Sequence, residues 1–179
     1  MSHAIMRIQK IKSMQALAER EKHNTRRKTV LSADGSNNIT VEGYTGLVGR
    51  VKALEKQIDA NNKRKTRKDA VRAIEVLFTS DKAFFKRVAH EQYFDECKKW
   101  LVDTFGEENL LQAVTHLDEE TPHLHAILTT VKDNKFNYSG YINGRQDLRA
   151  LQDSFFAQVE HLGLERGEKV ELTKATYQT

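Results

Sequence analysis

Apolar residues recur along this chain with two different spacings, which predict an alternation of β-strands and α-helices. Short runs rich in β-branched and aromatic residues predict strands. They occupy residues 4–11, 69–80, 110–117, 123–131 and 168–173. Apolar residues three or four positions apart predict amphipathic helices. These lie at residues 14–24, 47–58, 81–105 and 145–162.

Local signals mark the ends of several of these elements. Ser13 and Ser80 are predicted N-caps, because a serine hydroxyl can accept a hydrogen bond from a free amide of the first helical turn. Gly106 and Gly163 suit the left-handed position that commonly ends a helix. Residues 32–46 are rich in Gly, Asn and Ser and are predicted to form a loop.

The order of the elements favours an α+β fold over a doubly wound parallel one. Strands and helices alternate irregularly, and the strands at 110–117 and 123–131 are close enough to form a hairpin. We therefore expect a central, mainly antiparallel sheet flanked by helices. The 179 residues suit one domain. Since they end without a terminating signal, we expect residues 1–179 to be the N-terminal part of a longer protein.

Composition places the chain among globular proteins of a reducing compartment. Hydrophobic residues make up 39% and charged residues 30% of the sequence, and no apolar run approaches the ~20 residues of a membrane span. The N-terminus lacks the apolar segment of a signal peptide. The single cysteine, Cys97, excludes an intramolecular disulfide. These features predict a cytoplasmic protein.

The distribution of charge is more informative than the balance of 29 basic and 25 acidic residues. Two basic clusters stand out, EKHNTRRK at 21–28 and KRKTRK at 63–68. Such clusters can be solvated surface, or they can follow the phosphates of a nucleic acid. On the second interpretation the candidate DNA-binding residues are Lys63, Arg64, Lys65, Arg67 and Lys68.

The stretch HLDEETPHLH, residues 116–125, is the strongest candidate for a functional site. Side chains alternate along a strand, so His123 and His125 share a face, and a six-residue connection would place His116 opposite His123. Three imidazoles would then surround one point and leave positions open on a bound metal ion. The alternative is an exposed polar hairpin, but the apolar flanks LLQAV and AILTTV favour a central position in the sheet.

At this point the sequence resembles a known family. Histidine-hydrophobic-histidine on a central strand, with a third histidine seven residues earlier, resembles the HUH endonucleases. The longer string HLDEETPHLH is similar to the motif of plasmid mobilisation relaxases of the Mob/Pre (plasmid recombination enzyme, MobV) group. Four further stretches match that group in order and spacing: MRIQKIK (6–12), KHNTR (22–26), RKDAV (67–71) and TSDKAFF (79–85). Residues 31–44 depart from the family pattern, so the origin sequence is not predicted.

The resemblance implies a fold, an activity and a set of site residues. The implied activity is metal-dependent nicking and rejoining of one DNA strand at a plasmid origin of transfer, with the enzyme held covalently on the 5′ phosphate. The metal ligands would be His116, His123 and His125. His23 of the H-N-x-R motif would be the nucleophile and Arg26 would hold the scissile phosphate. Glu119 would orient or deprotonate His23.

The resemblance also implies partners. The substrate would be single-stranded and supercoiled plasmid DNA, and the cofactor a divalent metal ion, Mn²⁺ or Mg²⁺ before other transition metals. By family analogy the protein would act with conjugation machinery, and a C-terminal region beyond residue 179 could mediate oligomerisation.

Two other functions remain open from the residues themselves. A rolling-circle replication initiator would use a tyrosine, and Tyr138 and Tyr141 form a pair downstream of the metal motif. A non-catalytic DNA-binding domain would hold a structural metal, although such sites usually have four protein ligands. Tyr44 is interpreted as a residue that stacks on a DNA base.

Two acidic residues are candidates for positions just behind the metal ligands. Glu75 interrupts an apolar strand, and a buried carboxylate there would need a partner. Asp118 lies in the connection that follows His116. For Glu75, as for Arg67 in the basic loop, the alternative is a surface salt bridge.

Overall fold

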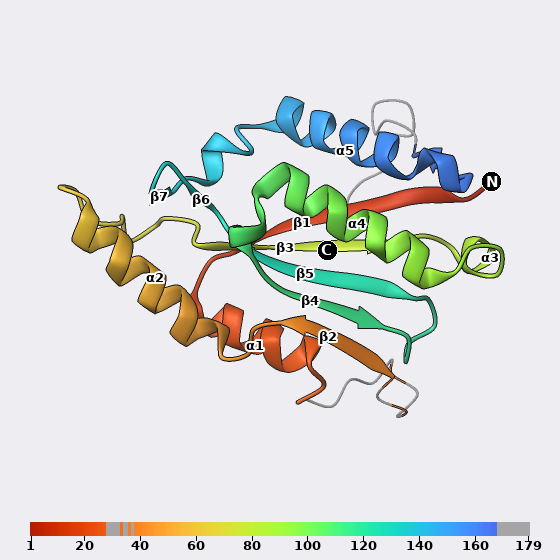
Figure 1. The fold of residues 1–179 in the computed structure, drawn as a ribbon, viewed down its shortest axis with the longest axis horizontal. Helices are drawn as coiled ribbons and strands as arrows, with labels where there is room; N and C mark the ends of the chain where they lie inside the picture. The colour runs from red at the N-terminus through yellow and green to blue at the C-terminus, as the bar shows by residue number, and fades with distance from the viewer. Residues whose placement is uncertain (28–32, 34–35, 37, 168–179) are drawn as a thin grey trace.

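The centre of the molecule is a six-stranded sheet (Figure 1). A computed structural model describes residues 1–27, 33, 36 and 38–167. The sheet strands are β1 (His3–Ile11), β2 (Ile39–Gly43), β3 (Ala73–Thr79), β4 (Leu110–His116), β5 (His123–Thr129) and β8 (Glu165–Arg166). They lie in the order β2-β4-β5-β3-β1-β8, and every neighbouring pair is antiparallel except β1 and β8. The predicted α+β class and the mainly antiparallel sheet are therefore confirmed.

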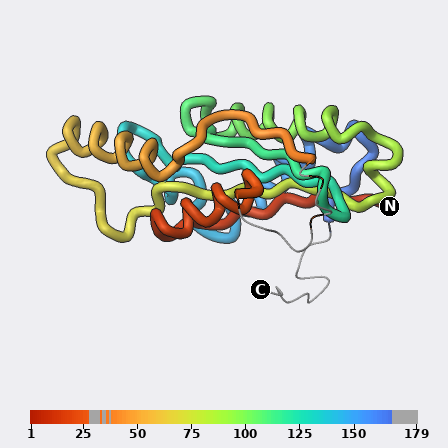
Figure 2. Tube along the Cα trace, turned by 90° about the horizontal axis from the view of Figure 1, so that it is seen from below, coloured from red at the N-terminus to blue at the C-terminus, as the bar shows by residue number. Residues whose placement is uncertain are grey.

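Helices cover both faces of this sheet. The α-helices are α1 (Met14–Asn24), α2 (Leu47–Asn61), α3 (Lys82–Phe85), α4 (His90–Phe105) and α5 (Arg145–Val159). The larger core cluster joins α4 and α5 to one face through residues such as Val76 and Phe78. The smaller cluster joins α1 and α2 to the other face through Leu17, Val51 and Ile127. Figure 2 shows α1 on the side of the sheet opposite α4.

The alternation of side chains along β3 sorts polar from apolar chemistry between the two faces. Ile74, Val76 and Phe78 point toward α4 and α5, so Glu75 and Thr79 point toward the α1 face. The candidate site lies on this second face. The helix α1 packs over part of this face, and its C-terminal residues His23 and Asn24 lie beside His116 at the end of the sheet.

The first helix begins as predicted. The Ser13 hydroxyl accepts a hydrogen bond from the Ala16 amide at 3.0 Å. The helix ends at Asn24, where Thr25 donates its backbone amide and its hydroxyl to the Glu21 carbonyl. The next residue, Arg26, has a φ of 55°, so the chain turns sharply there.

The prediction of one long helix from Ser80 to Phe105 is wrong. The Ser80 hydroxyl donates to the His3 carbonyl instead of capping a helix. Asp81 caps the short α3 by accepting from the Phe84 amide at 2.9 Å, and α4 begins only at His90. The break lets the aromatic rings of the two helices pack edge to face, with the Phe84 and Tyr93 centroids 5.2 Å apart.

The loop predicted at 32–46 contains a strand. β2 pairs with β4 along its whole length, although most of its side chains are exposed. The surrounding Gly, Asn and Ser residues conceal it, because its alternating stretch is only five residues long and most of its side chains are exposed. Gly43 ends it with a φ of 98°, and a Cβ there would lie 2.4 Å from the Leu111 carbonyl oxygen, so only glycine fits.

The C-terminal half follows the predicted order. A small hairpin, β6 (Val131–Lys132) and β7 (Lys135–Phe136), turns at two residues with positive φ, Asp133 and Asn134. The described part of the chain also contains three short 3-10 segments: η1 (Glu107–Asn109), η2 (Tyr138–Gly140) and η3 (Glu160–Leu162). Gly106 and Gly163 end their helices with positive φ, as predicted.

The strand predicted at 168–173 lies outside the described residues. Among the residues that are described, no helix combines the length and the apolar character needed to cross a membrane.

Candidate metal centre

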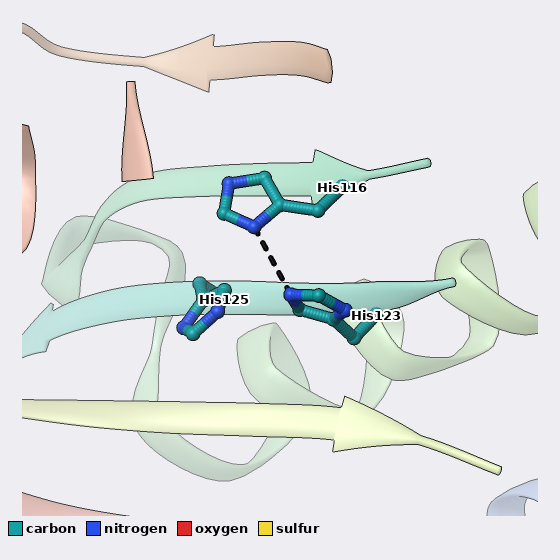
Figure 3. A group of neighbouring side chains, drawn as sticks. All are labelled: His116, His123 and His125. Carbon is teal, nitrogen blue, oxygen red and sulfur yellow. Dashed lines mark hydrogen bonds between the residues drawn. The ribbon is translucent and has the colours of Figure 1, made fainter. Parts of the chain in front are cut away.

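Three histidines meet at one end of the central hairpin (Figure 3). β4 ends at His116 and β5 begins at His123, and these two residues are paired directly across the strands, as the spacing predicts. His125 shares a face with His123 because it lies two residues further along β5. The three ring centroids lie 4.9 to 5.0 Å from one another.

Backbone carbonyls fix the tautomers of the first two rings. His116 Nε2 lies 2.8 Å from the carbonyl oxygen of Asn24, and His123 Nδ1 lies 2.9 Å from that of Thr121. A carbonyl can only accept, so these ring nitrogens carry the protons. The other nitrogens, Nδ1 of His116 and Nε2 of His123, then carry lone pairs, and they lie 3.0 Å apart.

Two lone pairs that face each other at this distance require a positive charge between or beside them. A shared proton is a poor source of that charge, because burial lowers the pKa of His116 to about 3 and also lowers the pKa of His123. A metal cation supplies it without protonation of either ring. One ligand atom from each of His116, His123 and His125 lies within 4.8 Å of the others, so the three side chains fit a single ion.

Glu75 orients the third ring. Its side chain is 4% exposed, and its Oε1 accepts a hydrogen bond from His125 Nδ1 at 2.9 Å. Arg20 binds the other carboxylate oxygen, and the Asn24 side-chain amide approaches Oε1 at 3.4 Å. Burial would raise the pKa of Glu75, but the hydrogen bond from His125 and the charge of Arg20 hold it below its usual range.

Because His125 donates its Nδ1 proton to Glu75, the Nε2 of the neutral ring carries the lone pair. A carboxylate behind a ligand histidine fixes the ring and strengthens it as a donor. Glu75 is thus buried, as its place in an apolar strand predicts, and His125 and Arg20 are the partners that its charge requires.

A fourth histidine reaches the cluster from α1. The ring centroid of His23 lies 6.2 Å from that of His116 and 6.0 Å from that of His125. Burial lowers the pKa of His23, and the charge of Arg26 lowers it further. The neutral imidazole is thereby favoured, and it retains a lone pair.

An ion-pair network holds the connection between β4 and β5 against the end of α1. Arg26 donates from Nε and Nη2 to both oxygens of Asp118, at 2.7 and 2.6 Å, and from Nη2 to Glu119 at 2.6 Å. The Arg26 and Asp118 side chains are 5% and 0% exposed. The hydrogen bond from Arg26 lowers the pKa of Asp118, so the pair is charged. Glu119 also approaches His123 Nε2 at 3.7 Å.

A second group, His116, Asp118 and Glu119, also brings ligand atoms within 4.8 Å. Both oxygens of Asp118 are already bound by Arg26, however, and Glu119 shares the same guanidinium. A metal on this group would compete with that ion pair. The three imidazoles are therefore the better metal site.

Comparison with known proteins agrees with this geometry. The sequence profile of the plasmid recombination enzymes (Mob_Pre) matches residues 1–178. This chain belongs to the plasmid recombination enzyme family. It is 37% identical over 183 residues to a plasmid recombination enzyme of Bacillus sp., a match that covers 94% of this chain and 43% of the relative. A type 1 enzyme of Staphylococcus aureus is 32% identical, with coverage of 97% and 46%.

Solved structures of the same family share the fold. The MobM relaxase domain, bound to plasmid pMV158 oriT DNA in an Mn-bound crystal structure, superposes with a TM-score of 0.85 at 26% identity. That match covers 99% of this chain and 95% of the MobM chain. This chain spans less than half the length of the curated plasmid recombination enzymes it matches.

The predicted DNA-binding residues of this family member lie away from the histidines. The basic loop, residues 63–68, leads into the start of β3 at Ala73, whereas the other end of β3, Thr79, pairs with His123. A seven-residue strand separates the two ends, or ~20 Å. Within the loop, Arg67 forms an exposed ion pair with Asp69 at 3.0 Å, so the alternative of a surface salt bridge describes its contact here.

Tyr44 is an exposed aromatic residue between β2 and α2. Its side chain is among the few large apolar groups at the surface of the described residues, with 45% exposure. The Arg50 guanidinium lies 3.2 Å from its ring centroid. A role for Tyr44 in stacking on DNA stays a prediction.

The downstream tyrosines lie on the opposite face of the sheet from the histidines. Tyr138 and Tyr141 both pack against the core cluster of α4 and α5. The Tyr141 hydroxyl donates to the Val131 carbonyl at 2.9 Å and accepts from the Asn109 amide. Burial raises the pKa of both phenols. This placement does not support either tyrosine as a nucleophile for the metal centre.

Several residues of the site were not found from the sequence. Asn24, Thr121 and Arg20 each fix a candidate ligand histidine or the carboxylate behind one. Two of them act through backbone carbonyls that any residue type would provide. The only sequence signal for Asn24 is its position next to His23, the predicted nucleophile. Arg20 had no signal in the sequence pattern.

Glu21 is another unforeseen residue, and it anchors α1. Gly46, at the N-cap of α2, has no side chain to offer, so the buried Glu21 carboxylate accepts from the Gly46 and Leu47 amides at 2.6 and 3.1 Å. The helix that carries His23 is thereby tied to the start of α2.

Replacement of Glu21 by alanine should destabilise the fold more than replacement of Ser13, the N-cap of α1 itself. Loss of a helix cap costs about 1 kcal/mol, and Glu21→Ala also leaves the buried Leu47 amide without an acceptor, for a total of about 2 kcal/mol. Urea unfolding of the two variants measures the difference. Equal destabilisation would show that water replaces the carboxylate at α2.

Proposed function

We propose that this chain is a DNA relaxase domain that cuts and rejoins one strand of plasmid DNA at an origin of transfer. The observation that carries the proposal is the convergence of four imidazoles. Three have ligand atoms around one point, and the ring centroid of His23 lies 6.0 to 6.2 Å from those of His125 and His116. Its support from relatives is the MobM relaxase domain, which binds oriT DNA and Mn. An open three-ligand metal site is typical of catalysis, whereas structural sites are usually closed by four ligands.

The metal would be held by Nδ1 of His116 and by Nε2 of His123 and His125. When bound, a divalent cation supplies Lewis-acid polarisation of the phosphate oxygens. We assign Mn²⁺ from the Mn-bound MobM structures. Mg²⁺ is the poorer candidate, because it prefers oxygen ligands and keeps several waters.

His23 is proposed as the nucleophile. One nitrogen of its neutral ring attacks the phosphorus, a P–N bond forms, and the bond from phosphorus to the 3′ oxygen breaks. The ring loses its N–H proton and the departing 3′ oxygen gains one, so charge and protons balance. Glu119 is the proposed first acceptor of the ring proton. The P–N bond keeps the energy needed to rejoin the strand when the 3′ hydroxyl attacks in return.

Arg26 is proposed to bind the scissile phosphate through one edge only. Its Nε and Nη2 groups bind Asp118 and Glu119, so the fork is not free for two phosphate oxygens. Nη1 makes only a long contact, 3.5 Å, with the His23 carbonyl. A phosphate beside His23 would meet this nitrogen, which stays positively charged beside its carboxylates.

The basic loop and Tyr44 are proposed as DNA contacts outside the reaction centre. Lys63, Arg64 and Lys68 are exposed and would neutralise phosphates. Action on supercoiled plasmid DNA, cooperation with conjugation machinery, oligomerisation through a C-terminal region and a cytoplasmic location extend the proposal to the longer protein by family analogy.

A covalent adduct with single-stranded origin DNA tests the proposed chemistry directly. The expected adduct forms with Mn²⁺, is lost in acid and survives in base, because a phosphoramidate is acid-labile whereas a phosphotyrosine ester withstands acid. Denaturing gel electrophoresis after acid and base treatment measures both. An acid-stable adduct would indicate tyrosine. No cleavage of a cognate supercoiled origin plasmid with any divalent ion would leave a non-catalytic DNA-binding domain.

A further inference from the structure

A hollow of about 350 Å³ lies at the end of α1 away from His23. We call it the α1–α2 hollow. Its floor is apolar and consists of core residues from β1, α1, α2 and β3: Ile11, Leu17, Val51 and Ala73. The half-buried Met14 forms part of its wall.

The rim of the hollow is positively charged. Lys12, Lys52 and Lys68 line it, all are exposed, and within the described ranges no hydrogen bond or ion pair engages their ammonium groups. Glu55 is the one acidic residue in the lining, and both of its carboxylate oxygens accept hydrogen bonds from Arg72, at 2.7 and 2.5 Å. The three lysines therefore leave a net positive charge around an apolar floor.

We propose that the α1–α2 hollow binds one unpaired nucleotide of the DNA strand that is cut at the metal centre. This inference rests on the proposed function. An apolar floor accepts the flat face of a base, and the ammonium groups at the rim accept its phosphate. The volume suits a ligand of nucleotide size, at the small end of ordinary ligand pockets.

The position of the hollow agrees with a role in holding the same strand. Ser13 lines it and His23 lies ten residues further along α1, which places the two about 15 Å apart on the same face of the sheet. Ala70 also lines a neighbouring hollow of about 670 Å³, which Lys63, Arg64 and Lys135 help to line. Phosphates on either side of the bound nucleotide would thus meet further cations.

A comparison of two lysines on α2 distinguishes binding in the hollow from general electrostatic attraction to DNA. Lys52 and Lys56 are both exposed and lie one turn apart, but only Lys52 lines the hollow. The probe is a fluorescein-labelled thymidine 24-mer, and the protein carries His23→Ala so that no cleavage occurs. Lys52→Gln should weaken binding about tenfold, the loss of one charged hydrogen bond, whereas Lys56→Gln should weaken it less than twofold.

Photochemical crosslinking locates the base itself. A thymidine 24-mer that contains 4-thiothymidine should crosslink to a peptide that includes Met14, and Lys52→Gln should reduce that crosslink while Lys56→Gln leaves it. Equal effects of the two variants, or crosslinks only elsewhere in a bound complex, would overturn the inference. So would equal competition by polyglutamate, which would indicate a site for any anion, acidic peptides included.

The binding test and the adduct test can fail separately, so the two proposals can be distinguished. If the hollow binds the oligonucleotide but no covalent adduct forms with wild-type protein, the proposed function fails and the nucleotide site stands. If the adduct forms and Lys52 behaves like Lys56, the proposed function stands and the nucleotide site fails.

Discussion

Replacement of His23 by alanine will abolish covalent capture of DNA while the metal centre still binds Mn²⁺. His23 is not one of the three proposed ligands that meet within 4.8 Å, so its loss should remove the proposed nucleophile and leave the ion bound. Adduct formation should fall by a factor on the order of 10³ or more, the usual consequence of removing a nucleophile. Gel quantification of the adduct measures the first effect, and electron paramagnetic resonance of free Mn²⁺ measures the second.

The tyrosines provide matched controls for this experiment. Tyr138→Phe and Tyr141→Phe each remove a hydroxyl on the α4–α5 face of the sheet, away from the imidazoles. Both variants should form the adduct at a rate close to that of wild type. An adduct that survives His23→Ala and disappears in one tyrosine variant would reverse the assignment and favour the replication-initiator chemistry.

Loss of metal affinity is the second large effect. It should be larger for replacement of His125 than for replacement of Glu75, which bonds the His125 ring from behind. His125→Ala removes one of three donors and should weaken Mn²⁺ binding by more than about a hundredfold. Glu75→Gln keeps the shape of the side chain but removes the charge behind the His125 ring, and should weaken binding by 10- to 100-fold, roughly the range for such partners. Titration calorimetry with Mn²⁺ gives both constants.

His161→Ala is the control for the general loss of an imidazole. His161 is 53% exposed and lies beside Glu96, at the end of α5, so Mn²⁺ affinity should be unchanged. Circular dichroism will show whether the buried substitutions retain the fold. A folded Glu75→Gln variant with wild-type affinity would mean that the carboxylate does not influence the metal through His125.

Local spacing was sufficient to predict that three imidazoles meet at one point. His123 and His125 had to share a face because strand side chains alternate, and a six-residue connection placed His116 opposite His123. The same local reasoning found the Ser13 cap and a strand in which Glu75 would be buried. It failed at Ser80, whose hydroxyl was taken by a backbone carbonyl of β1, 77 residues away. It failed again at β2, which exists because β4 lies beside it.

Sequence alone therefore determined most of the elements, the antiparallel class and the convergence of the three imidazoles, all of which depend on contacts between near neighbours in the chain. Only the tertiary structure decided how the site is completed. It brings the end of α1 over the hairpin, so that His23 approaches the cluster and the Asn24 carbonyl sets the His116 tautomer across 92 positions. It also pairs Arg20 with Glu75, and Arg26 with Asp118 and Glu119. These pairings depend on how helices dock on the sheet, and docking is set by the whole buried surface rather than by any local pattern.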